Sequence, residues 1–307
     1  MTASRILVIG SANIDLVAHA PHCVRPGESL IGRAFETVCG GKGANQAVAA
    51  ARLGASTYFA GCVGNDAFGE MQRRSLAEAG VDVSHLKSHP NKPTGTALIC
   101  VADDGQNSIV VVPSANLELR PADIDAVGAL FAEMDAVLLQ LEIPLDTVQA
   151  ALDMARRYGV VSILDAGPAQ AVPEAIVRAA DVVSPNETEA EAMTGITVDS
   201  IEHAREAAEA LSDLGAREVV IKLGAQGALY HGHETFHVPA FRVSPVDTTA
   251  AGDAFTAALA LNWRSLPRRE ALRVANAVGA LATTAAGAQP SMPTRDAVER
   301  FLMDAQQ

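Results

Sequence analysis

The chain has 307 residues, of which 49% are apolar, and a formal net charge of −13. A chain of this length and composition can bury a large core, in one α/β domain or in two smaller domains. Its acidic balance argues against a protein that binds nucleic acid or an anionic membrane through charge, and it favours a small-molecule partner.

Strand-length apolar runs alternate with helical patterns along most of the chain. The runs lie at 6–9, 57–63, 136–141, 160–164, 181–184 and 218–223, and the helical patterns at about 65–80, 121–133, 145–158, 186–194 and 201–214. This alternation is typical of a Rossmann-like, mostly parallel sheet with helices on both faces.

Residues 94–116 break this rhythm, because they hold two β-rich runs around the turn signal DDGQN. We expect a hairpin that joins the polar stretch 13–40 in a small β-sheet lid on a single domain, 1–307. The alternative is an extra edge hairpin on the main sheet. From Ala250 onward the pattern is helical, with a long alanine-rich stretch over 270–286 and a loop at GAQPSMP, 287–293.

The cysteines and the N-terminus predict the compartment. Cys23, Cys39, Cys62 and Cys100 form no CxxC or Cys–His pattern, so we expect buried free thiols. No run approaches the about 18 apolar residues that span a bilayer, and the N-terminus shows no cleavage site. The sequence therefore predicts a soluble, cytoplasmic protein.

Two polar motifs suit the binding of hydroxyl groups. The stretch CGGKGANQAVAAARLGA (39–55) is not a Walker P-loop, but its glycines permit close backbone approach, and Lys42 and Asn45 supply donors. In GSANIDLV (10–17), Asn13 and Asp15 fall on one side of an extended chain, although turn capping explains them equally well. Glu142 ends the strand AVLLQLE, at the edge where open α/β sheets bind ligands.

Two further motifs suit a nucleotide. SPNETEAEAMTG (184–195) starts a helix near Asn186, and a capping box of Asn186 with Glu189 is the simpler explanation for that motif alone. IKLGAQGALY (221–230) passes from strand to strand through Gly224 and Gly227, a turn that can hold phosphates on backbone N–H groups.

The stretch DTTAAGDAF (247–255) predicts an anion hole at a helix start. Ala250, Ala251 and Gly252 should have free N–H groups, and their small side chains leave room for a phosphoryl group. We expect the helix N-terminus to keep Asp253 ionised, so that this carboxylate can accept a hydroxyl proton.

Over essentially the whole chain, these motifs resemble the ribokinase-like carbohydrate kinases. The resemblance rests on GSANIDLV, GGKGANQAVAA, QLEIP, SPNETEAE, LGAQG, DTTAAGDAF and AGAQPSMP, in this order. It implies transfer of the γ-phosphoryl group of ATP to the 5-hydroxyl of D-ribose. One departure is Ala250, since the family more often has glycine there.

The resemblance also implies a role for each matching residue. The sugar would contact Asn13, Asp15, Gly41, Lys42, Gly43, Ala44, Asn45, Glu142 and Asp253, the last as base beside the anion hole of Ala250, Ala251 and Gly252. ATP would contact Asn186, Lys222, Leu223, Gly224, Ala225, Gln226, Gly227, Gly252 and Asn276, which replaces a histidine that some members carry near the adenine. Asn186 and Glu189 would organise Mg²⁺ through water, and an activating K⁺ would lie near Asp247, Thr249, Ala282, Ala285, Gly287 and Ser291.

Other readings remain open on the sequence alone. A sister kinase could act on 2-deoxyribose, another small sugar or a nucleoside. A non-catalytic sugar-binding module should have lost Asp253 or the glycine before it, and an oxidoreductase should carry GxGxxG after the first strand, where this chain has IGSANID. The apolar strand edges of the hairpin predict a homodimer in which two lids pack together.

Overall fold

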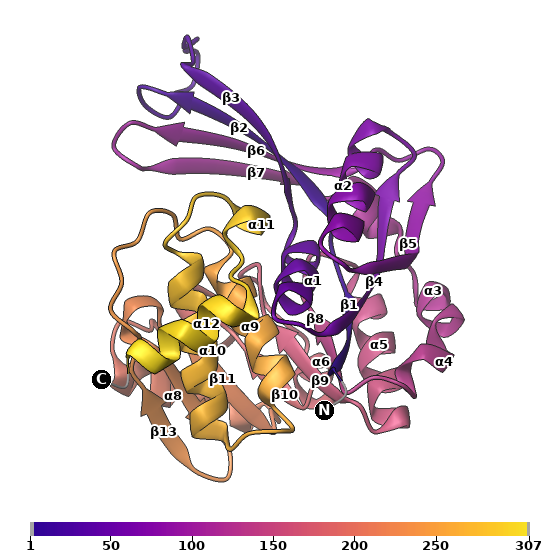
Figure 1. Ribbon diagram of the computed structural model, residues 1–307, viewed down its shortest axis with the longest axis vertical. Helices are drawn as coiled ribbons and strands as arrows, with labels where there is room; N and C mark the ends of the chain where they lie inside the picture. Colours follow the sequence, from indigo (N-terminus) through magenta and orange to yellow (C-terminus); the bar gives the residue numbers. More distant parts are fainter. Residues whose placement is uncertain (1–2, 306–307) are drawn as a thin grey trace.

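Figure 1 shows the computed structural model, which describes residues 3–305. A nine-stranded sheet with helices on both faces forms the body, and a four-stranded sheet projects from one end of it. This arrangement confirms the predicted fold class.

The nine-stranded sheet is parallel except at one edge, where β12 and β13 are added antiparallel. In spatial order the strands are β13 (Thr235–Val238), β12 (Ala228–His231), β11 (Glu218–Lys222), β10 (Val182–Ser184), β9 (Val161–Asp165), β8 (Ala136–Leu139), β1 (Arg5–Ile9), β4 (Ser56–Gly64) and β5 (Asp82–His89).

The strand order reverses between β1 and β8. From β1 the chain adds β4 and β5 on one side, and it later adds β8 to β11 on the other side. Connections that leave two neighbouring parallel strands in opposite directions open a crevice at their carboxyl ends, which is where open α/β sheets bind ligands.

Apolar side chains fill both faces of this sheet. One core lies under α1 (Lys42–Arg52), α2 (Ala67–Glu78), α9 (Ala251–Asn262), α10 (Arg268–Ala282) and α12 (Arg295–Asp304). The other lies under α3 (Pro121–Ala126), α4 (Gly128–Phe131), α5 (Leu145–Tyr158), α6 (Glu174–Ala179), α7 (Glu187–Thr194) and α8 (Ile201–Asp213). The short helices η1 (Ser114–Glu118), η2 (Gly224–Gln226) and α11 (Ala288–Ser291) lie in the connections.

Helices α1 and α9 pack against each other through small side chains. Their buried positions are mostly alanine, which lets two helices approach closely. This contact brings the polar residues of α1 next to the first turn of α9.

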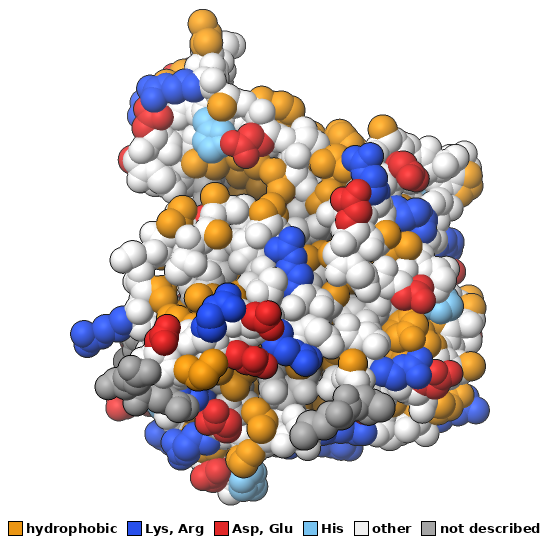
Figure 2. Space-filling view, viewed as in Figure 1, with side chains coloured by type: hydrophobic (Ala, Val, Ile, Leu, Met, Phe, Trp, Pro, Cys, Tyr) orange, Lys and Arg blue, Asp and Glu red, His pale blue; other side chains and the backbone are white. Residues whose placement is uncertain are grey.

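The four-stranded sheet has the order β3 (Ala34–Gly40), β2 (Asn13–Ala20), β6 (Gly95–Ala102) and β7 (Asn107–Val112). Strands β2 and β6 pair in parallel, and the outer pairs are antiparallel. The hairpin therefore joins segment 13–40 as predicted, and the alternative of an edge hairpin on the main sheet is wrong. In Figure 2, hydrophobic side chains are visible on this projecting sheet.

Several elements differ from the sequence prediction. The strand β5 and the helix α6 were not predicted, because β5 is largely polar and α6 is too short to show a helical period. The helix expected over 121–133 is interrupted at Val127, beside Gly128, and the loop expected over 287–293 contains α11. Helix α10 ends at Ala282, short of the predicted 286.

All four cysteines are free, as predicted, but only two of them are buried. Cys39 and Cys62 are buried, whereas Cys23 and Cys100 are partly exposed because they lie in the projecting sheet and its turn. Among the described residues, no helix has the length and apolar character needed to cross a bilayer.

Candidate active site

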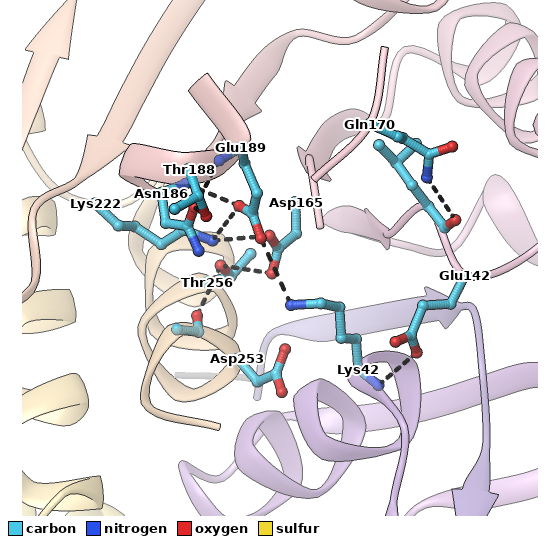
Figure 3. Close-up of polar contacts among 12 residues, drawn as sticks. Lys42, Glu142, Asp165, Gln170, Asn186, Thr188, Glu189, Lys222, Asp253 and Thr256 are labelled. Atoms are coloured by element: carbon cyan, nitrogen blue, oxygen red, sulfur yellow. Dashed lines mark hydrogen bonds and ion pairs between the residues drawn. The ribbon is translucent and has the colours of Figure 1, made fainter. Parts of the chain in front are cut away.

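The candidate site lies where the carboxyl ends of the central strands meet the N-termini of α1, α7 and α9 (Figure 3). Charged and polar side chains gather there although most of them are buried. Asp165 is fully buried, and Asp253, Glu189 and Lys222 are each less than 10% exposed. Burial of this many ionisable groups requires that they satisfy one another.

The turn before α1 requires glycine. Gly41 has a φ of 89°, and a Cβ there would lie 2.7 Å from the backbone nitrogen of Asn13. The first N–H groups of α1 have local acceptors, since Lys42 N–H donates to Glu142 Oε2 at 3.2 Å and Gly43 N–H donates to Ser11 Oγ at 3.4 Å, while the Ser11 hydroxyl donates to the same Glu142 oxygen. Glu142 therefore fixes the start of α1 in addition to any contact with a ligand.

Asn13 lies at the first position of β2, where the projecting sheet joins the body. Its Oδ1 accepts a hydrogen bond from Asn116 Nδ2 at 2.6 Å, and Asn116 Oδ1 accepts from Ala12 N–H at 2.9 Å. Asn116 is fully buried and holds the amide of Asn13 in one orientation.

Asp15 shares a face of β2 with Asn13, because side chains in a strand alternate. Burial raises the pKa of Asp15 to about 6, and the negative charges of Glu142 and Asp253 add to that rise. The carboxylates of Asp15, Glu142 and Asp253 are therefore close enough to interact electrostatically. Together they make this part of the site rich in hydrogen-bond acceptors.

Asp253 lies in the first turn of α9 and is held from α1. Its Oδ2 accepts from Asn45 Nδ2 at 3.0 Å, and its Oδ1 accepts from Gln46 Nε2 at 3.1 Å. Asn45 Oδ1 is buried and has no hydrogen-bond partner among residues 3–305. An orphaned acceptor beside a carboxylate fits a ligand hydroxyl.

The ionisation of Asp253 has a different basis from the predicted one. Burial raises the pKa of Asp253 to about 6; Lys42 opposes this rise and Asp165 adds to it. The group is still mostly ionised at pH 7, as expected, but burial and not a neighbouring charge has the largest effect on its pKa. Desolvation outweighs Lys42 and the hydrogen bonds from Asn45 and Gln46.

The start of α9 confirms only part of the predicted anion hole. Within residues 3–305, the N–H groups of Gly252 and Asp253 have no protein acceptor, whereas Ala251 N–H already donates to the Thr248 carbonyl at 3.3 Å. Ala250 precedes the helix in the left-handed region with a φ of 58°, which is strained for a residue with a Cβ.

Asn186 and Glu189 form the predicted capping box of α7. Asn186 Oδ1 accepts from Glu189 N–H and Glu189 Oε2 accepts from Asn186 N–H, both at 2.8 Å. The Glu189 carboxylate also faces two ammonium groups, with Lys42 Nζ at 3.7 Å and Lys222 Nζ at 3.8 Å. The simple capping explanation is therefore correct for Asn186 and incomplete for Glu189.

Lys42 extends into the middle of the charged cluster. Burial opposes its charge, but neighbouring carboxylates outweigh burial and raise its pKa. The carboxylates that do so belong to Asp165, Asp253, Glu189 and Glu142.

The expected nucleotide turn follows β11. Gly224 and Gly227 have φ values of 48° and 101°, and a Cβ on Gly227 would collide with the Val238 carbonyl. Leu223 N–H donates to Gly227 O at 2.8 Å and closes the turn. Near this turn, both contacts of the Asn276 amide nitrogen are to the backbone, at Val238 O (3.0 Å) and Pro239 O (3.2 Å).

The residues expected around a monovalent cation come from two loops that touch. Asp247 Oδ2 accepts from Gly287 N–H at 2.8 Å, and Asp247 Oδ1 accepts from Thr249 N–H at 2.9 Å. Asp247 N–H also donates to the Thr283 carbonyl at 3.1 Å, just after Ala282. The Ser291 hydroxyl donates to the Ala288 carbonyl.

Comparison with known proteins places the chain in a family. The model of the pfkB family carbohydrate kinases matches residues 3–295. The chain belongs to the pfkB family of carbohydrate kinases. It is 39% identical over 301 residues to a ribokinase of Haemophilus influenzae, and the alignment covers 97% of this chain and 98% of that protein.

Two other pfkB-family relatives bear on the substrate. A deoxyribokinase of Salmonella typhi is 36% identical over 300 residues, with 97% of this chain and 98% of that protein covered. The structure of Arabidopsis thaliana ribokinase complexed with ribose and ATP superposes with a TM-score of 0.92 at 35% identity, covering 98% of this chain and 99% of that one.

Sequence reasoning missed six polar residues of this pfkB-family site: Ser11, Gln46, Asn116, Gln140, Asp165 and Thr256. Asp165 could have been found, because it ends a predicted strand as Glu142 does. Gln46 lies inside a motif that was singled out, but a glutamine in an alanine-rich helix gives no sign of its partners.

Proposed function

We propose that this pfkB-family kinase transfers the γ-phosphoryl group of ATP to the 5-hydroxyl of D-ribose and releases ribose 5-phosphate, which is a ribokinase reaction. The observation that carries the proposal is a buried carboxylate, Asp253, at a helix start with unused N–H groups and beside the acceptor-rich pair Asn13 and Asp15. The relatives named ribokinase support ribose as the sugar.

In the proposed mechanism, α1 and β2 bind the sugar. Asp15, Asn13 and the orphaned Asn45 Oδ1 accept hydrogen bonds from its hydroxyl groups. Asp253 orients the 5-hydroxyl and receives its proton as the new P–O bond forms and the bond to ADP breaks. The N–H groups of Gly252 and Asp253 stabilise charge on the transferring phosphoryl group.

The nucleotide and the metal would lie on the other side of Asp253. The turn Lys222–Gly227 and Asn186 would bind ATP, and Glu189, a carboxylate that lies among ammonium groups, would organise Mg²⁺ through water. Mg²⁺ would neutralise phosphate charge. The joined loops of Asp247 and Gly287 would hold an activating K⁺ through carbonyl oxygens and the Asp247 carboxylate.

We also propose a homodimer that forms through the projecting sheets, each of which serves as a lid over its own sugar site. Exposed apolar side chains on β6 and β7 support this assembly. The four free thiols support a cytoplasmic location.

A coupled assay of ATP consumption across four acceptors tests the function. We expect kcat/KM for D-ribose to exceed that for 2-deoxyribose, fructose and adenosine by about tenfold or more. The missing hydroxyl of 2-deoxyribose leaves a buried polar group unpaired, and the other two acceptors differ from ribose in size. The second candidate is a deoxyribokinase, which the Salmonella typhi relative favours. A higher kcat/KM for 2-deoxyribose would replace the first proposal with the second.

A further inference from the structure

We propose that Gln46 is a positioning residue that fixes the carboxylate of Asp253 against the buried ion pair of Asp165 and Lys222. The inference rests on the proposed role of Asp253 as base. It adds a residue that supports this base from α1. None of the roles assigned above from the sequence motifs includes Gln46.

Gln46 bridges two buried carboxylates with one amide group. Its Nε2 donates to Asp165 Oδ2 at 2.8 Å and to Asp253 Oδ1 at 3.1 Å, and its Oε1 accepts from Gln140 Nε2 at 2.6 Å. The side chain is fully buried, so no water competes for these bonds. Only the NH₂ end of an amide carries two donors, so two carboxylates on one side dictate its orientation.

The far end of this bridge is anchored. Lys222 Nζ donates to Asp165 Oδ1 at 2.7 Å, and both groups are at least nine-tenths buried. Burial opposes the charge on Asp165, but Lys222 and Lys42 outweigh burial and lower its pKa. Asp165 therefore stays ionised, and if it moved away the buried ammonium group of Lys222 would lose its hydrogen-bonded partner and keep only Glu189 at 3.8 Å. A fixed Asp165 gives Gln46 a fixed point from which to hold Asp253.

Gln46 and Asn45 together hold both oxygens of Asp253. Asn45 Nδ2 donates to Oδ2 and Gln46 Nε2 donates to Oδ1, so the plane of the carboxylate is set from α1. Without Gln46 one oxygen of Asp253 would lose its donor, and Lys42 alone would counter the negative charge of Asp165. A catalytic group that is misplaced by about 1 Å can lose about 100-fold in rate, so the orientation of this base matters.

Several charged groups face Asp253 from the elements around it. Lys42 on α1 favours the ionised form, and Asp165 at the end of β9 and Asp15 on β2 oppose it. Glu142, Glu189 and Lys222 complete the charged surroundings. The Gln46 donor favours ionisation, so its removal raises the pKa of Asp253. The activity of a base rises as it loses its proton, so the rising limb of the pH profile of kcat/KM moves to higher pH.

The test uses Gln46→Met, which keeps the length of the side chain and removes the donors. We expect kcat at pH 7 to fall about tenfold or more and the rising limb to move up by about one pH unit, with the Kd values for ribose and ATP within about threefold of wild type. Thr147→Val is the matched control. Thr147 lies on the distant helix α5, and the change removes its buried hydroxyl, which donates to the Leu119 carbonyl. It should lower Tm and leave the pH profile unchanged.

A double variant separates positioning from general damage. In the Asp253→Asn background, Gln46→Met should change kcat by less than about twofold, because its effect passes through Asp253. The same fold loss in both backgrounds, or an unchanged pH profile, overturns the inference. If Asp253→Asn is inactive while Gln46→Met behaves as wild type, the inference alone fails; if Asp253→Asn is fully active, the proposed base fails.

Gln140→Leu provides a second route if Gln46→Met does not fold. It removes the donor that fixes the amide of Gln46, and it also removes a buried oxygen without a partner in residues 3–305. The fold should therefore tolerate it, while the amide of Gln46 becomes free to turn. We expect a smaller upward shift of the same limb, and a limb at its wild-type position contradicts the positioning role.

Discussion

Asp253 shows how a single side chain combines burial with chemistry. A carboxylate with its usual pKa is a weak base at pH 7, and one that is neutral at pH 7 cannot accept a proton. Burial raises the pKa of Asp253 to about 6, between these limits, while hydrogen bonds from Asn45 and Gln46 keep the charged form accessible. The same burial that opposes its charge therefore suits it to take a proton from a hydroxyl group.

Asp253→Asn should remove the base and leave the fold. We expect kcat to fall by about 10²- to 10⁴-fold, because asparagine can contact the hydroxyl but cannot take its proton. Affinity for ATP and Tm should change little, since asparagine keeps the size of the side chain and the unpartnered Asn45 Oδ1 can turn to accept from its NH₂ group. The wild-type profile of kcat/KM against pH, which reports ionisations of the free enzyme, should also rise through about pH 6, where burial places the pKa of Asp253.

Steady-state kinetics, calorimetry with ATP and a melting curve of this variant check these expectations. Near-wild-type kcat together with a lowered Tm would show that Asp253 serves only the start of α9.

Asp15→Ala should separate sugar binding from nucleotide binding. The carboxylate lies in the proposed sugar site, and hydrogen bonds to charged groups contribute about 1.5–3 kcal/mol, so the Kd for ribose should rise about 10- to 100-fold. The Kd for ATP should stay within about twofold. Calorimetry with each ligand separately measures both values, and an equal loss for the two ligands would contradict this division of the site.

Ala250 carries backbone strain that glycine would relieve. A φ of 58° destabilises a residue with a Cβ by about 1–2 kcal/mol. Glycine removes this strain, but its greater flexibility in the unfolded state lowers the free energy of unfolding by about 0.5–1 kcal/mol. Ala250→Gly should therefore raise Tm by about 2 °C and keep kcat, because the backbone N–H stays in place.

The neighbouring change Ala251→Gly is the stability control. Ala251 is the first residue of α9, so glycine there should lower Tm and not raise it. If both variants lower Tm equally, the left-handed backbone of Ala250 is not a source of strain.

At the scale of elements, the hydrophobic periodicity predicted the strands and helices that a local pattern encodes, whereas the other elements depend on tertiary packing. The apolar runs predicted the central parallel strands, and the turn signal DDGQN predicted the β6–β7 hairpin. The edge strand β5 escaped because only one of its faces meets the core, and no apolar run is required there.

The same limit applies to the site. Glu142, Asn186 and Asp253 could be predicted because strand ends and helix starts are visible in the sequence. The link from Gln46 to Asp165 joins residues 119 positions apart and exists only because α1 packs on β1, β4 and β8, so that Gln46 reaches the last residue of β9. No local pattern encodes such a contact, so the buried support of the base required the folded structure.

The contact between the loop of Asp247 and the loop of Gly287 leads us to expect a response to monovalent cations. Asp247 ties its own loop to Gly287 and Thr283, so a cation bound there would order the segment that leads into α9. We expect K⁺ to raise kcat more than Na⁺, because a carbonyl-rich site suits the larger, weakly hydrated ion. Asp247→Asn should reduce the difference. Equal rates in KCl and NaCl at matched ionic strength would exclude a selective site.

At the scale of the whole molecule, the projecting sheet exposes large apolar side chains on the face that points away from Asp15. Leu98 pairs with both Leu16 and Val110, and Phe35 pairs with Ala18, which shares a face of β2 with Leu16. This outer face is therefore opposite to the face that carries Asp15. Phe35, Leu98 and Val110 are 64%, 49% and 59% exposed, an arrangement that a solvated sheet normally avoids.

We expect two copies to pack these outer faces together and to form a homodimer at micromolar concentration. A stable interface of this kind buries about 1,200–2,000 Å², which four strands from each copy can supply. Val110→Lys should place a charge in the centre of that interface and produce monomers. Ile109→Lys is the matched control, because Ile109 is adjacent on β7 and 53% exposed but lies on the opposite face. Sedimentation velocity of the three proteins separates the outcomes: a monomeric wild type, or equal dissociation by both variants, would show that the outer face does not join two copies.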